Sequence, residues 1–207
     1  MQYKAAFTSQ HKVSDFLTSG ACPYCPKVGV HVSQFSDERI LVVFRDRRYG
    51  LSMIRKYCPA DLDRLKEITT ICFEGVSIDR NIETTFGQIG EHDWQWRKLR
   101  HIDNDVAGAN AEGVFVYQDG SNIVGYITCR LDAGSKIGWI PNMAVIPAAQ
   151  GKGIGKQLME HAFGYFKGSG MELAKIETLE QNPIGQVFYP GVGFEEVGRQ
   201  LHYAKKL

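Results

Sequence analysis

The segment VIPAAQGKGIGK, residues 145–156, is the most informative stretch of this 207-residue chain. It passes from a β-branched strand end through a proline turn into three closely spaced glycines, and then directly into an amphipathic helix. Glycines let the backbone approach a ligand closely, and the unpaired N–H groups at a helix start attract anions. The segment therefore predicts a cradle for a phosphate or pyrophosphate group, with Lys152 and Lys156 adding charge at its rim.

Two other phosphate-binding motifs do not fit this segment. A dinucleotide fingerprint requires G-x-G-x-x-G, whereas Gly151, Gly153 and Gly155 are each two residues apart. A Walker loop requires Ser or Thr directly after the Gly-Lys pair, and Gly153 stands there instead. A tight strand-to-helix turn that binds no ligand is the remaining alternative, and the loop alone leaves it open.

Helices and strands alternate on both sides of the loop. Helices are predicted from apolar residues at helical spacing, at 59–72, 94–102, 154–166 and 183–189. Strand patterns are found at 52–55, 114–117, 123–128, 137–146, 174–179 and 198–205. We expect the glycine-containing stretch 73–89 to be irregular, and Pro141 to bend the strand that contains it. This order indicates a mixed α/β or α+β sheet with helices on both faces.

Two motifs resemble the signatures of the GNAT superfamily of N-acetyltransferases. Gln150-x-x-Gly153-x-Gly155 is similar to the family's Q/R-x-x-G-x-G/A, and Asn182 followed by Tyr189-x-x-x-Gly-Phe is similar to its second signature. The resemblance covers residues 51–207. It implies a GNAT-like fold, with a mixed, mostly antiparallel central sheet and helices on both faces. It also implies an acetyl-CoA-dependent N-acetyltransferase that acts on a primary amine of a small molecule or a protein.

The resemblance further implies which residues bind acetyl-CoA and which residue is catalytic. The pyrophosphate would lie on the glycine loop and the pantetheine arm along the strand before it. The implied cofactor-binding residues are Met143, Ala144, Val145, Gln150, Gly151, Lys152, Gly153, Ile154, Gly155, Lys156 and Asn182. Tyr189 matches the family's general acid: a phenol, with a pKa of about 10, is protonated at neutral pH and can reprotonate the departing thiolate. A backbone N–H near 143–145 would stabilise the oxyanion.

The chain also departs from the family pattern. Pro190 and Gly191 follow Tyr189, so we expect the helix to end there and Tyr189 to be displaced. Trp139 stands where some members have a glutamate base, which leaves the base unassigned. The candidate bases are Glu177, Glu180, His92 or a chain of waters, and each of these side chains is also explained as a surface or structural residue. A degenerate GNAT-fold module that binds acyl-CoA without turnover is the alternative function.

The acceptor is expected to bind near the stretch 74–96. Its candidates for attracting a cationic amine are the acidic residues and two tryptophans, namely Glu74, Asp79, Glu83, Glu91, Asp93, Trp94 and Trp96. The alternative is a charged helix start with one tryptophan buried in the core. The sequence does not identify the acceptor or the acyl chain length.

Residues 1–50 are expected to form an N-terminal extension to the acyltransferase domain, residues 51–207. Cys22 and Cys25 lie in a CPYC segment that looks like a glutaredoxin dithiol, but fifty residues are too few for that domain. Their spacing to His31 suits zinc, yet no fourth ligand is selected between His11 and Cys58. We therefore predict no metal site, and two reduced cysteines in a loop.

The bulk composition limits the partners. The net charge is +1, so no global field attracts nucleic acid or an anionic membrane. The longest aliphatic run near the start, residues 40–44, is too short to span a bilayer. Five scattered cysteines fit reduced thiols in the cytoplasm. We predict a cytoplasmic protein whose partners are acetyl-CoA and an amine, and the sequence is compatible with a homodimer.

Overall fold

The computed structural model describes residues 4–7, 32–34, 40–43 and 52–207. The chain divides into two compact units, residues 1–51 and 52–207. The first unit contains a three-stranded antiparallel sheet with the order β1-β3-β2, from β1 (Lys4–Phe7), β2 (Val32–Gln34) and β3 (Ile40–Val43). The CPYC segment, with Cys22, Cys25 and His31, lies outside the described residues, so the predictions made for it remain predictions.

The second unit contains two sheets. The first sheet is antiparallel throughout, with the order β4-β5-β6-β9, from β4 (Met53–Lys56), β5 (Val114–Asp119), β6 (Asn122–Thr128) and β9 (Met143–Val145). The second sheet has the order β10-β8-β7, from β7 (Arg130–Asp132), β8 (Ile137–Ile140) and β10 (Leu173–Ile176). In it β8 pairs antiparallel with β7 and parallel with β10. The predicted mixed, mostly antiparallel sheet is therefore present in two parts.

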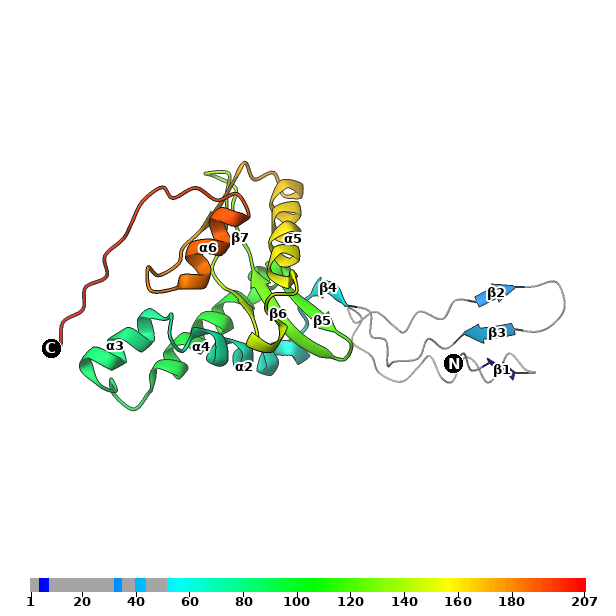
Figure 1. The fold of residues 1–207 in the computed structure, drawn as a ribbon, viewed down its shortest axis with the longest axis horizontal. Helices are drawn as coiled ribbons and strands as arrows, with labels where there is room; N and C mark the ends of the chain where they lie inside the picture. Colours follow the sequence, from blue (N-terminus) through cyan, green and yellow to red (C-terminus); the bar gives the residue numbers. More distant parts are fainter. Residues whose placement is uncertain (1–3, 8–31, 35–39, 44–51) are drawn as a thin grey trace. The chain divides into compact units, whose positions relative to one another are not determined.

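Helices lie on both sides of the first sheet (Figure 1). Those before β5 are α2 (Leu62–Phe73), α3 (Ile78–Phe86) and α4 (Trp94–Asp105). Those after β9 are α5 (Ile154–Gly168) and α6 (Pro183–Gly191). Short 3-10 turns precede α2, β5 and α5, at Pro59–Asp61, Gly108–Gly113 and Pro147–Ala149.

Two apolar cores follow from this layering. On one face Leu158, Met159 and Phe166 of α5 pack into a cluster with Phe115 and Ile127 of the sheet. On the other face the cluster combines residues of α2, α4 and the sheet, among them Leu65, Ile68, Ile102, Val116 and Tyr126. Because strand side chains alternate between the two faces of a sheet, β5 and β6 each contribute residues to both cores.

The structure confirms the predicted bend at Pro141. β8 ends at Ile140 and β9 begins at Met143, so the expected single strand 137–146 is two strands in different sheets. Proline has no N–H to donate to a ladder, which explains why the pairing changes at this point.

Two predictions were wrong. The stretch 73–89 contains α3, because Ser77 caps the helix start by accepting a hydrogen bond from the N–H of Asp79 at 3.2 Å. The segment 198–205 is not a strand, although its apolar residues alternate. None of the described strands pairs with it, and Val197, Leu201 and Tyr203 are exposed. A strand requires a neighbour to satisfy its backbone groups, which an alternating pattern cannot supply.

Candidate functional site

The candidate site lies where the two sheets of the second unit separate. β10 pairs with β8 as far as Ile140, whereas β9 pairs only with β6, on its other side. β9 and β10 therefore share no ladder, and none of the strands that the structure describes pairs with the other edge of β9. An extended ligand with amide groups can add to such an edge as a further strand does. This places Met143, Ala144 and Val145 at the edge where the pantetheine arm is expected.

The glycine loop joins β9 to α5. Gly151 and Gly153 have positive φ angles of 76° and 77°, which other residues rarely adopt. α5 begins at Ile154 without a side-chain cap, and the first backbone bond back to the loop is from the N–H of Gln157 to the carbonyl of Gly153, at 3.1 Å. The preceding N–H groups at the helix start have no intrahelical acceptor. The loop thus presents donors suited to a phosphate oxygen.

Gln150 ties the loop to the strand. Its Nε2 donates to the carbonyl of Val145 at 2.9 Å, and the Sγ of Cys72 on α2 approaches the same carbonyl at 3.4 Å. The side chain of Gln150 thus acts within the chain, by fixing the loop against β9. Burial raises the pKa of the Cys72 thiol to about 11, so this thiol stays protonated and unreactive at neutral pH.

Gly155 is the point where three elements meet. A Cβ on this glycine would stand 3.2 Å from the Phe188 ring and 3.3 Å from the Cε of Met143. β9, the first turn of α5 and α6 are therefore in contact around it. Lys152 and Lys156 are exposed, and the amine of Lys156 lies 4.0 Å from the carboxylate of Glu160. The predicted contribution of the two lysines to phosphate binding remains a prediction.

Asn182 has a structural role at the start of α6. Its Oδ1 accepts from the N–H of Gly185 at 3.1 Å, and its Nδ2 donates to the hydroxyl of Thr178 at 2.9 Å. Gly185 is required here, because a Cβ would lie 2.6 Å from that hydroxyl. The side chain that the family motif assigns to cofactor binding is thus already engaged in capping the helix that carries Tyr189.

Tyr189 lies on α6, among aromatic side chains. It makes edge contacts with Phe188 and Phe194, at ring-centroid distances of 5.5 and 6.0 Å. α6 continues two residues past the expected end, to Gly191, so Pro190 lies inside its last turn. No hydrogen bond joins the Tyr189 hydroxyl to another residue of 52–207, and burial raises its pKa to about 12. The hydroxyl is therefore protonated at neutral pH and available to a ligand.

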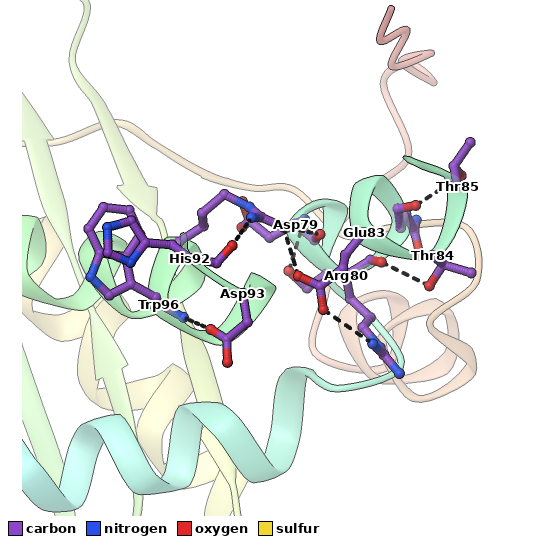
Figure 2. A network of polar contacts seen from close by, with 11 residues as sticks. Asp79, Arg80, Glu83, Thr84, Thr85, His92, Asp93 and Trp96 are labelled. Carbon is purple, nitrogen blue, oxygen red and sulfur yellow. Dashed lines mark hydrogen bonds and ion pairs between the residues drawn. The ribbon is translucent and has the colours of Figure 1, made fainter. Parts of the chain in front are cut away.

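The acidic residues expected to bind the acceptor are mostly paired within the chain (Figure 2). Arg97 lies 3.3 Å from a carboxylate oxygen of Glu83 and 3.9 Å from one of Asp79. Asp93 caps α4 by accepting from the N–H of Trp96 at 2.8 Å. These contacts confirm the alternative of a charged helix start, and Trp94 is the tryptophan buried in the core.

The three candidate bases also have partners. The ring of His92 stacks on Trp96 with a centroid distance of 3.6 Å. Glu177 pairs with Lys175 at 2.7 Å, and Glu180 pairs with Arg199 at 2.9 Å. Each of the three side chains thus has a local contact, and the base stays unassigned among the residues that the structure describes.

A polar cluster beside the bend, buried at Asp105, Thr128 and Asn142, was not anticipated. It contains Lys98, Asp105, Thr128, Arg130 and Asn142, from α4, β6, β7 and the corner between β8 and β9. Burial lowers the pKa of Lys98 to about 8. Its sequence signal is weak, because the charged residues look like the polar face of a helix. A hollow of about 260 Å³, lined by Asp79, Arg97 and Arg100 with His101 and Asn104, also lies on α3 and α4.

Within the ranges that the structure describes, no group of three or more His, Cys, Asp or Glu side chains is arranged to hold a metal ion. Among the helices of those same residues, none is both long and apolar enough to cross a membrane.

Comparisons with known proteins agree with this geometry. A [ribosomal protein bS18]-alanine N-acetyltransferase of Haemophilus ducreyi is 28% identical over 89 residues, which are 42% of this chain and 59% of the relative. The chain thus spans less than two thirds of that relative's length. The PaiA N-acetyltransferase of Thermoplasma acidophilum, solved with coenzyme A, superposes with a TM-score of 0.58 at 21% identity, over 70% of this chain and 90% of that one. PH1933 of Pyrococcus horikoshii superposes with a TM-score of 0.57 at 25% identity, over 72% and 92%.

The model of the acetyltransferase (GNAT) family matches residues 64–194, which include both sequence motifs and the two sheets from β5 onward. The predicted family and fold are confirmed. The chain belongs to the acetyltransferase (GNAT) family.

Proposed function

We propose that the chain is an acetyl-CoA-dependent N-acetyltransferase that moves the acetyl group to a primary amine of a small molecule or a protein. The observation that carries this proposal is the convergence at Gly155. There the unpaired edge of β9, the uncapped start of α5 and the helix that bears Tyr189 are in contact.

Coenzyme A fits these residues on two counts. The backbone N–H groups of 151–156 suit its pyrophosphate, since no side chain occupies the helix start. The edge of 143–145 suits the amides of its pantetheine arm. When bound, acetyl-CoA supplies the thioester carbonyl that the amine attacks.

Tyr189 completes the proton balance. The amine loses a proton as its bond to the acetyl carbon forms, and the departing sulfur needs one as its bond to that carbon breaks. We assign to the Tyr189 hydroxyl the donation to sulfur, followed by recovery of the proton that the amine releases. Its raised pKa keeps it protonated, but also makes it a weaker acid than an exposed tyrosine.

The acceptor need not be highly cationic. Asp79, Glu83 and Asp93 are each bonded within the chain, so they offer little free charge to a polyamine or an aminoglycoside. The Haemophilus ducreyi relative is named for a ribosomal protein alanine. We therefore place peptide amino termini first among the acceptors to test, and a cytoplasmic location belongs to the same proposal.

The test measures thiol release from acetyl-CoA, with the product identified by mass. The amines are an alanine-initiated peptide, amino acids, polyamines, arylamines and aminoglycosides. Release that yields an acetylated amine supports the proposal and identifies the acceptor class. Coenzyme A binding without release for every amine would favour the degenerate binding module. Light scattering on the same preparation shows whether a homodimer forms.

A matched pair of variants tests the loop. Gly155→Ala places a methyl group 3.2 Å from the Phe188 ring, whereas the Cβ of Gly164→Ala, on the same helix, meets nothing within 4 Å. We expect Gly155→Ala to weaken acetyl-CoA binding and Gly164→Ala to leave it unchanged. Equal affinities for both variants would argue against the loop as the cofactor site.

A further inference from the structure

The corner between β8 and β9 is held entirely from one side. The backbone N–H of Asn142 donates to the hydroxyl of Thr128 at 3.0 Å, and its carbonyl accepts from the Thr128 N–H at 2.8 Å. The side-chain Nδ2 donates to Asp105 at 2.7 Å, and Oδ1 accepts from Lys98 at 2.7 Å. Each polar group of this buried residue therefore has a partner in β6 or α4, and among the described residues no hydrogen bond joins it to β10.

The orientation of the Asn142 amide follows from the chemistry of its partners. An ammonium group can only donate a hydrogen bond and a carboxylate can only accept one, so Oδ1 must face Lys98 and Nδ2 must face Asp105. The Lys98 amine is held in place from a second direction, 4.0 Å from the centre of the Phe73 ring. The corner thus has one satisfied arrangement.

Asp105 connects this corner to the second sheet. While one carboxylate oxygen bonds Asn142 and Thr128, the other accepts from the guanidinium of Arg130 on β7 at 2.6 Å. That guanidinium lies over the ring of Trp139 on β8, 5.4 Å from its centre. Asp105 is the last residue of α4 and only 2% exposed. A single buried carboxylate therefore bonds both sheets at the point where they separate.

We propose that Asp105 is a positioning residue that fixes the opening between β9 and β10, and through it the affinity for coenzyme A. This inference rests on the proposed function, because the opening matters only if the pantetheine arm lies along β9. Without the carboxylate, Asn142 and Arg130 each lose a buried charged partner. Asn142 is then free to turn toward β10, and the unpaired edge of β9 loses its fixed position.

The experiment measures coenzyme A binding by titration calorimetry, which requires no turnover. We expect Asp105→Asn to weaken binding about tenfold, equivalent to about 1.4 kcal/mol. The matched control is Asp61→Asn. Asp61 is also buried, at 5%, and bonds Arg55 at 2.7 and 2.8 Å, but it lies in the turn before α2. Its loss should lower the melting temperature similarly and leave the affinity for coenzyme A unchanged.

A reciprocal exchange of Asp105 and Asn142 tests whether their hydrogen-bond geometry, and not stability in general, sets the affinity. In the double variant Asp105→Asn with Asn142→Asp, the amide at 105 can donate to the carboxylate at 142 and still accept from Arg130. Lys98 then pairs with the new carboxylate. We expect this exchange to restore the affinity to within about threefold of the wild type, which a general loss of stability would not do.

A milder variant covers the case in which Asp105→Asn does not fold. Arg130→Met removes the ion pair that joins Asp105 to the second sheet and leaves the bonds of Asp105 to Asn142 and Thr128 in place. Because the Arg130 side chain is 35% exposed, we expect this change to weaken binding only about threefold. Unchanged affinity in Arg130→Met, or equal affinities for Asp105→Asn and Asp61→Asn, would overturn the inference. A wild type that binds coenzyme A without acetyl transfer would refute the catalytic proposal alone, whereas no binding at all would refute both.

Discussion

The two sheets of the second unit differ in how far their strands are exposed to solvent. Residues 123–128 of β6, in the first sheet, are all buried between the two apolar cores. β10, in the second sheet, has no fully buried residue, and its Leu173 is 59% exposed. The first sheet therefore carries most of the stability, and the second supplies an edge whose position relative to β9 can be set by few contacts. We therefore expect a substitution in the first sheet to lower the stability of the fold. A substitution at the boundary between the two sheets should instead lower cofactor binding or activity.

The largest expected effect is a cavity in the first sheet. Ile127 is fully buried, so Ile127→Ala should lower the free energy of unfolding by about 2–5 kcal/mol. Leu173→Ala, on the exposed strand, is the control and should change it by about 0.5 kcal/mol or less. Urea titration measures both, and similar losses would erase the contrast between the sheets.

Removing the Tyr189 hydroxyl should affect the rate and spare the fold. We expect Tyr189→Phe to lower kcat about 100-fold with little change in the melting temperature. Tyr165→Phe is the control, since Tyr165 packs on Phe115 from α5. Because the Tyr189 pKa is about 12, its deprotonation cannot cause a fall in kcat between pH 8 and 10. An unchanged kcat in Tyr189→Phe would contradict the assignment, whereas a fall in that range that disappears in Tyr189→Phe would contradict only the raised pKa.

The second sheet is sensitive at one point, where α5 rests on it. A Cβ on Gly138 would stand 2.4 Å from the Phe166 ring, so Gly138→Ala should cost about 1–3 kcal/mol in thermal or urea unfolding. Gly164→Ala places its methyl group in open space within a helix and should stabilise by about 0.5–1 kcal/mol. If Gly138→Ala leaves the free energy of unfolding unchanged, the second sheet or the Phe166 ring can shift to accommodate the added methyl group.

The last expected effect is the most gradual one, a dependence of stability on pH. Burial lowers the folded-state pKa of Lys98 to about 8, below its ordinary value, so the folded state binds fewer protons than the unfolded state between these values. Lys98 therefore makes stability rise with pH from about 8 toward 10.5. The melting-temperature difference between wild type and Lys98→Met should shift in favour of the wild type over this range. Lys66→Met, which removes a lysine paired with Asp103, is the control.

The sequence was informative where local rules decide the structure. The glycine loop, the amphipathic α5 and the bend at Pro141 depend on backbone preferences that the residues themselves carry. α3 was missed because its cap, Ser77, resembles any loop serine and its start follows a glycine. The strand expected at 198–205 failed for the opposite reason, since pairing depends on a partner elsewhere in the fold.

The polar cluster around Asp105 could not have been predicted from the sequence. Asp105 and Asn142 are 37 residues apart, and nothing local marks either as buried. Likewise, the acidic residues near α3 suggested a cation site until the structure placed Arg97 beside Asp79 and Glu83. Charges predict function poorly when their neutralising partners come from another element.

The buried thiols have a practical consequence for assay design. Cys58 and Cys129 are buried, and the pKa values of Cys72 and Cys129 are raised to about 11 and about 12. Disulfide exchange proceeds through the thiolate, so these three side chains should react slowly with a chromogenic disulfide reagent. Coenzyme A released in the reaction carries an exposed thiol. A continuous colorimetric assay can therefore follow turnover over a low and steady background from the cysteines of 52–207.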